Sequence, residues 1–157
     1  MNNKFRFRSH AVLWLTSLSL FVVLALAACA PAATPTPANT MTGILWQWAS
    51  VTDAGKTTTV PNPTKYTIVF NTDGTITGQA DCNSFTGAWT QAGGGLTIKL
   101  GASTMAFCGE ASLDQQYLTL LSNVAAGGSD GAGGLALETA GGAQRMVFTN
   151  GGPAPQK

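Results

Sequence analysis

The residues with the most chemical potential lie in one stretch, Gly-Gln-Ala-Asp-Cys-Asn-Ser-Phe-Thr-Gly-Ala-Trp over positions 78–89. Cys82 stands between Asp81 and Asn83, and Cys108 follows further along the chain. A thiol beside an acid and an amide could act as a nucleophile or as half of a redox pair. The two cysteines lack the Cys-x-x-Cys spacing that tunes thiol pKa values, so a structural bridge is the favoured interpretation.

The first 28 residues have the pattern of an export signal. Basic residues at positions 4, 6 and 8 precede an apolar run over positions 11–25, which is short for a membrane span. The tetrad Leu-Ala-Ala-Cys that ends at Cys29 resembles the lipobox of bacterial lipoproteins. That resemblance implies that Cys29 becomes the first mature residue and carries acyl chains on its sulfur and amine. Two chains anchor a protein stably, so we expect an outward-facing protein bound to the bilayer through Cys29. An uncleaved signal anchor is the alternative.

Removing residues 1–28 changes what chemistry the chain can perform. His10 is the one histidine in the sequence, so the mature chain would have no Ser-His-Asp or Cys-His arrangement and no usual zinc site. The mature chain would contain five basic and seven acidic residues, and its basic residues form no cluster in the sequence. We therefore expect no enzymatic activity, no catalytic residues, no cofactor, no metal and no nucleic acid partner. Asp130 lies in a Gly-rich run that could bind calcium, but a flexible loop is favoured.

The remaining cysteines suggest a cross-link. With Cys29 assigned to lipid, Cys82 and Cys108 are left as a pair in an oxidising compartment, where a disulfide is expected. Two buried free thiols are the alternative. Asp81 and Asn83 have two interpretations: a surface recognition site, or side chains that bond to the backbone and shape the turn around Cys82. Asx residues readily make such bonds, which favours the second interpretation.

The rest of the sequence predicts the elements that position these residues. Positions 29–42 read as a Pro/Thr/Ala tether, 43–150 as one folded domain and 151–157 as a disordered tail. Alternating apolar residues and turn signals predict short strands at 44–49, 65–71, 75–80, 84–90, 96–100, 104–108, 135–139 and 145–149. A helix with a Ser112/Gln115 capping box is expected over 113–124, and loops over 51–64 and 127–134. The fold class is mainly β: a small antiparallel β-barrel-like or sandwich domain of seven or eight short strands, with one α-helix before the closing hairpin.

Two sequence elements carry a family resemblance. One is Gly-x-x-x-Cys-Asn-x-Phe-x-Gly over 78–87, and the other is Thr-Met-Ala-Phe-Cys over 104–108. With the order of strands and helix, they resemble the META domain of the HslJ-like family of bacterial envelope proteins over about residues 43–149. Asp81 stands where that family usually has glycine. The resemblance implies a small antiparallel barrel-like fold and an association with heat shock, envelope stress and antibiotic tolerance. It supplies no catalytic residues.

The leading hypothesis is therefore a membrane-anchored, non-enzymatic lipoprotein of the cell envelope with a binding or stress-tolerance role. Its partner would be an envelope protein or a small ligand. One alternative is a barrel that binds a small ligand or peptide, with Trp46, Trp48 and Trp89 lining its mouth, although core positions are the commoner use of such aromatics. Another is an inhibitor of extracellular proteases that presents the loop over 51–64 or the loop over 127–134.

Overall fold

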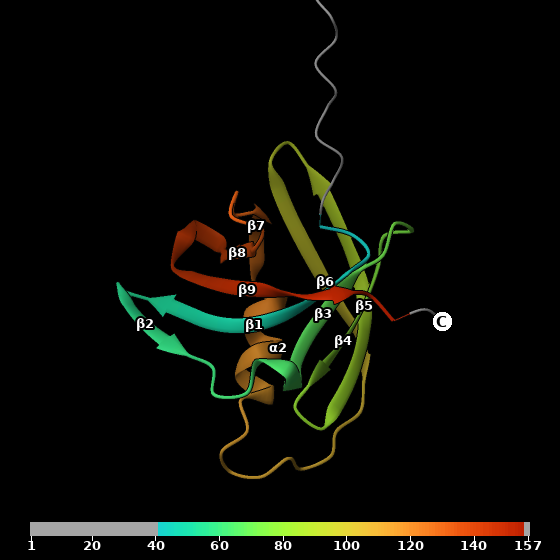
Figure 1. The fold of residues 1–157 in the computed structure, drawn as a ribbon, viewed down its shortest axis with the longest axis vertical. Helices are drawn as coiled ribbons and strands as arrows, with labels where there is room; N and C mark the ends of the chain where they lie inside the picture. Colours follow the sequence, from blue (N-terminus) through green and yellow to red (C-terminus); the bar gives the residue numbers. More distant parts are fainter. Residues whose placement is uncertain (1–40, 156–157) are drawn as a thin grey trace, which may run out of the picture. The chain divides into compact units, whose positions relative to one another are not determined.

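The computed structural model describes residues 41–155, and these form a closed antiparallel barrel with one helix. The predicted signal peptide, Cys29 and most of the predicted tether lie outside the described residues. Within 41–155, no helix is both long enough and apolar enough to cross a membrane. Figure 1 shows the strands wrapping around the helix. The predicted fold class is confirmed.

The barrel is built from consecutive hairpins. Its elements are β1 (Ile44–Asp53), β2 (Lys56–Thr59), β3 (Tyr66–Phe70), β4 (Thr75–Ala80), β5 (Asn83–Ala92), β6 (Gly95–Ser103), α2 (Asp114–Ser122), β7 (Val124–Ser129), β8 (Leu135–Thr139) and β9 (Gln144–Pro153). Short 3₁₀ turns lie at Pro63–Lys65 and Ala140–Gly142. Each strand from β3 onward pairs with the next, and β1 pairs with both β3 and β9, which closes the ring. β2 pairs with β1 alone and lies outside the ring.

The β3–β4 hairpin forms as its alternating pattern predicts. Tyr66, Ile68 and Phe70 point to one face and are buried. Gly74 has a φ of 82°, a left-handed conformation that glycine adopts without steric cost. The Asp73 carboxylate accepts hydrogen bonds from the Thr75 backbone N–H at 2.9 Å and from the Thr75 hydroxyl at 2.6 Å. The turn is therefore specified by residues within it.

The closure of the barrel is uneven. β1 and β9 pair along almost their whole length, from Ile44↔Pro153 to Asp53↔Gln144. In contrast, β6 and β7 share a single pair, Gly95↔Ala126. The 104–113 connection and α2 lie between these two strands in the chain, so β7 starts from the end of the helix rather than from a hairpin. The barrel therefore has one long seam and one short seam.

The helix contributes the centre of an aromatic core. The Tyr117 ring is fully buried and stacks on the Trp48 ring, with centroids 5.1 Å apart. Tyr66, Phe85 and Phe148 surround it at centroid distances of 5.7, 6.1 and 6.3 Å. Side chains thus fill the interior of the barrel. Burying aromatic rings of this size is among the largest apolar contributions to stability that a small core has.

The tryptophans are structural. Trp46 and Trp48 are buried, and their indole N–H groups donate to the Met41 carbonyl at 2.8 Å and the Ser50 carbonyl at 2.9 Å. Trp89 is half-buried and packs edge-on against Phe70, with centroids 5.4 Å apart. These positions belong to the core and its margin and do not line an open cup.

Several local expectations were wrong. Residues 104–108 form no strand, because an asparagine side chain takes up the backbone groups that a neighbouring strand would use. The expected polar loop over 51–64 contains the end of β1 and all of β2, a Thr-rich hairpin whose second strand is fully exposed. Because β2 has no buried face, its sequence shows no apolar alternation that would predict a strand.

The glycine-rich run and the tail also differ from expectation. Residues 127–129 belong to β7, and Gly127 is there because an added Cβ would lie 2.6 Å from the Leu137 side chain. Positions 151–153 extend β9 instead of fraying, since they pair with the start of β1. Met41, assigned to the tether from its sequence, is buried in the core. The helix begins at Asp114, whose backbone N–H donates to the Ser112 hydroxyl at 3.2 Å. The Gln115 side chain donates to the Asp114 carboxylate instead of reaching back to Ser112, so the Ser112/Gln115 capping box does not form.

Candidate functional site: the corner and the loop that it holds

Three consecutive residues at the turn from β4 into β5, positions 81–83, form a corner that holds a distant loop; the third of them is the first residue of β5. Cys82 and Cys108 are joined by a disulfide, with their Cα atoms 5.6 Å apart. Asp81 has a φ of 57°, in the left-handed region that favours glycine. Aspartate is one of the few other residues that tolerate it.

Asp81 ties the corner to β3 and to the start of the helix. Its carboxylate, almost buried, accepts a hydrogen bond from the half-exposed Lys65 ammonium at 2.8 Å and from the Tyr66 hydroxyl at 3.2 Å. Tyr66 in turn accepts the Leu113 backbone N–H at 2.9 Å. The Lys65 hydrogen bond, followed by that of Ser112, lowers the pKa of Asp81, and the same contact with Asp81 raises the pKa of Lys65.

Asn83 ties the corner to the loop over residues 104–108. Its side chain is 2% exposed. The amide oxygen accepts the Ala106 N–H at 2.7 Å and the Thr104 hydroxyl at 3.0 Å. The amide nitrogen donates to the Ala106 carbonyl at 3.0 Å and to the Asp114 carboxylate at 3.3 Å. The Asn83 amide thus makes the two hydrogen bonds to the Ala106 backbone that a neighbouring strand would otherwise make.

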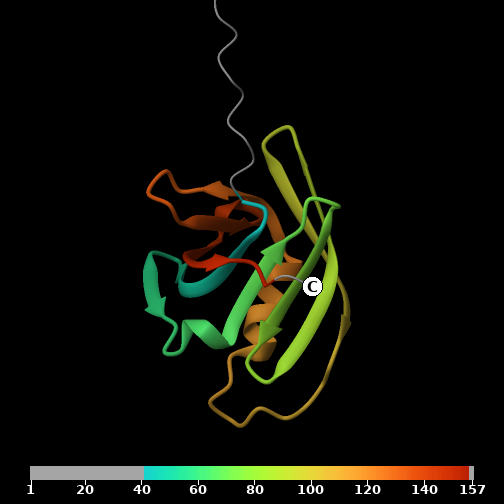
Figure 2. The same ribbon diagram turned by 45° about the vertical axis from the view of Figure 1, so that its right-hand side comes forward.

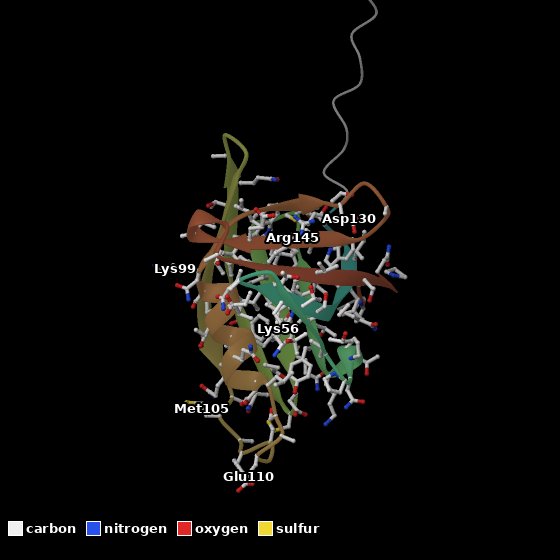
Figure 3. The ribbon with its side chains drawn as sticks, turned by 90° about the vertical axis from the view of Figure 1, so that its left-hand side faces the viewer. Lys56, Lys99, Met105, Glu110, Asp130 and Arg145 are labelled. Atoms are coloured by element: carbon white, nitrogen blue, oxygen red, sulfur yellow. A yellow bond between two sulfur atoms is a disulfide. The ribbon has the colours of Figure 1, made fainter. Side chains whose placement is uncertain are left out.

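The 104–108 loop presents two large apolar side chains to solvent. Met105 is 90% exposed and Phe107 is 84% exposed, the two large hydrophobic residues of the described chain that lie in water. Figures 1 and 2 show that the segment between β6 and α2 lies at the end of the barrel opposite the β5–β6 turn. In Figure 3, Met105 lies at the same end as Glu110, away from Asp130 and Arg145. A fixed loop with exposed apolar side chains is suited to binding another molecule.

Sequence reasoning identified the corner but not the role of this loop. It assigned Met105 and Phe107 to a strand, because apolar residues alternated on either side of Ala106. The run over 101–109 contains no charged residue, but an uncharged strand has the same composition, so the sequence alone could not separate the two. Asp81 and Asn83 lie at the corner together with Cys82 and Cys108, and all four act on the shape of the 104–113 connection.

Two hollows lie on the surface of the barrel. One of about 330 Å³ lies behind the loop and is lined by Lys65, Asp81 and residues 108–113. The other, of about 910 Å³, is a shallow groove across the outer faces of β3, β4 and β5. Within the first hollow, Lys65, Tyr66 and Asp81 bond to one another, as described above. Tyr66 lines the first hollow and Phe85 the second, while the central rings of the core, Trp48 and Tyr117, line neither.

No candidate metal centre is found among residues 41–155, where no three His, Cys, Asp or Glu side chains cluster. Asp130 uses its carboxylate on its own loop, accepting the backbone N–H groups of Ala132 and Gly134, both at 2.8 Å. These two bonds lower the pKa of Asp130. Its role is therefore to shape the turn between β7 and β8.

The chain is similar to known proteins both in sequence and in structure. A family model described as the META domain matches residues 39–151. No curated protein matches the chain. A solved NMR structure of a protein from Burkholderia xenovorans is similar with a TM-score of 0.57 and 20% identity, over 78% of this chain and 95% of that one. A crystal structure of a DUF4847 family protein from Bacteroides vulgatus has a TM-score of 0.55 and 15% identity, over 69% of this chain and 93% of that one. Both proteins therefore share the fold of this chain.

Proposed function

Because the chain belongs to the META-domain family, we propose that it is a non-enzymatic binding protein of the cell envelope, held at the membrane by an acylated Cys29. The observation that carries the binding role is the 104–108 loop. It exposes Met105 and Phe107 while Asn83 and the disulfide hold its backbone in place.

The exposed side chains and the fixed backbone of the loop both favour binding. Burying one side chain of this size in a partner would contribute about 1.5–3 kcal/mol. A flexible loop would lose much of that gain in ordering entropy, but this loop is already ordered by the fold. A small cluster of apolar anchors on a rigid support is the usual arrangement of an interface that depends on a few residues.

The tether is compatible with such a role. A Pro-rich segment of this length spans up to about 40 Å when extended, at about 3.1 Å per residue. The described chain begins in the upper half of the domain in Figure 1, and the 104–108 loop lies at the lower end. Anchoring through residue 41 would therefore leave the loop accessible to other envelope proteins.

A ligand inside the barrel has less support. Trp48, Tyr117 and Phe148 are fully buried against one another and occupy the interior. A resident ligand would need these rings to move apart, at the cost of their packing. The surface loop is the better candidate for binding.

Capture from solubilised envelopes tests this function. Full-length protein should retain a partner that the double variant Met105→Ser/Phe107→Ser does not retain, while Ala132→Ser, in an exposed loop at the other end, behaves as wild type. Equal capture by all three proteins would refute a role for the loop. Normal membrane retention and processing of Cys29→Ser would separately refute the lipid anchor.

The proposed role in stress tolerance needs a test in cells. A strain lacking the gene should survive heat or an envelope-directed antibiotic less well, and wild-type protein should restore survival. The double loop variant, expressed at the same level, should not restore it. Restoration by that variant would separate stress tolerance from the loop.

A further inference from the structure

The loop has a free hydrogen-bonding edge. Both backbone groups of Ala106 bond to the single amide of Asn83, the N–H at 2.7 Å and the carbonyl at 3.0 Å. The N–H and C=O of one residue point to the same side only when its backbone is extended. The backbone groups of Met105 and Phe107 then point to the opposite side, where no described residue bonds to them. Edge groups of this kind are a template for another chain.

The exposed side chains follow the same alternation. Met105 and Phe107 are two residues apart, so an extended backbone sends both to one face, where they are exposed. The segment over 101–109 carries no charge. Together these features describe a short extended strand with a free edge and two apolar side chains, which is the form in which peptides bind by strand addition.

We propose that this loop binds in the substrate cleft of an exported serine protease that cuts after large apolar residues, and inhibits it. This rests on the proposed binding function of the loop and names the class of partner. Phe107 enters the apolar pocket that selects the residue on the acyl side of the cut bond. Met105 takes the second site on the same face, and the free edge pairs with the cleft.

The disulfide and the Asn83 hydrogen bonds hold the loop, which explains why the protease would be inhibited and the loop would not be digested. On attack, the enzyme's serine oxygen bonds to the Phe107 carbonyl carbon, the bond from that carbon to the Cys108 nitrogen breaks, and the serine proton goes to that nitrogen. The disulfide to Cys82 keeps the new amine beside the acyl group, and Asn83 keeps Ala106 in place. The amine can therefore displace the serine, which restores the peptide bond and the serine proton. Resynthesis of the peptide bond therefore competes with hydrolysis of the acyl-enzyme and release of the cleaved protein.

The test uses full-length protein in mild detergent with chymotrypsin and trypsin as probes. Wild type should inhibit chymotrypsin with a constant below about 1 μM and leave trypsin active. Phe107→Lys should weaken inhibition of chymotrypsin at least 100-fold and create inhibition of trypsin. Ala132→Lys, which places the same lysine in another exposed loop, should behave as wild type. This exchange of specificity distinguishes occupancy of the cleft from general adhesion.

A second variant tests the fastening. Asn83→Ala retains the disulfide and the bonds between Thr104 and Ser84 but releases Ala106, so chymotrypsin should cut it at the bond after Phe107 at least 10-fold faster than wild type. Rapid cleavage of wild type, or no inhibition of chymotrypsin, overturns the proposal. Binding to vesicles of phosphatidylethanolamine and phosphatidylglycerol through the two side chains, without inhibition, also overturns it. Capture from envelopes is a separate measurement, so a loop-dependent result there would still support the proposed binding function.

Discussion

Breaking the corner disulfide should cost a large part of the stability of the domain. Cys82 and Cys108 are 26 residues apart, and α2 follows directly after the loop that they close. In the chain-entropy treatment, a closed loop of that length reduces the freedom of the unfolded chain by about 3.5 kcal/mol at 25 °C. For a domain of this size, each kcal/mol corresponds to about 4 °C in Tm. The double variant Cys82→Ser/Cys108→Ser should therefore unfold about 14 °C lower.

The assay is equilibrium unfolding in urea, followed by the fluorescence of the buried tryptophans Trp46 and Trp48. The midpoint of unfolding should fall, and the slope should rise, because an unfolded chain without the cross-link exposes more surface. Wild type measured in the presence of a reductant is the matched control and should approach the double variant. Serine retains the size of cysteine and limits the cavity that is left.

Two results would refute this reasoning. A loss of less than about 1 kcal/mol would mean that the hydrogen bonds of Asn83 hold the loop without the cross-link. A large loss with an unchanged slope would place the effect in the folded state, as strain or lost packing, and not in the unfolded chain.

Three further changes have defined outcomes. Gly74→Val forces a branched side chain into the left-handed conformation and should lower the free energy of unfolding by about 1–2 kcal/mol, with Gly74→Asn less affected; an unchanged urea midpoint would contradict the turn. Tyr117→Phe should leave the domain as stable or more stable, because the buried hydroxyl has no hydrogen-bond partner among the described residues and an unpaired polar group costs about 1–3 kcal/mol; a lower Tm would reveal a partner. Asp81 has a lowered pKa when folded, so its contact with Lys65 stabilises the domain above the ordinary value of 3.8 and is lost as pH falls through the lowered value. Asp81→Asn, which tolerates the same backbone conformation, should therefore lose less stability between pH 6 and pH 2.5 than wild type does.

What the sequence could predict was mostly local. The β3–β4 hairpin is specified by alternation from Tyr66 to Phe70 and by the turn at Gly74, so it could be identified without knowledge of the rest. The same holds for α2, whose apolar spacing matches its buried face. Short-range rules work where an element's partner is its own neighbour in the chain.

The missed features depend on contacts between distant segments. The 104–108 loop has the composition of a strand, and only the arrival of Asn83 from the corner takes its backbone out of the sheet. Gly127 and Gly128 look like a loop because glycine has low strand propensity, yet β7 needs the absence of a side chain where it approaches Leu137. None of these partners can be read from neighbouring residues.

The pairing of the first and last strands has a consequence for how the domain is made. β1 meets β9 along nearly its full length, and the two are separated by the whole domain in sequence. During synthesis, one edge of β1 stays unpaired until the final residues of the domain are made. Contacts of such high contact order form late and slowly. The last step of folding is therefore the closing of the ring, and truncation within Gln144–Pro153 should leave an open sheet that is prone to aggregation.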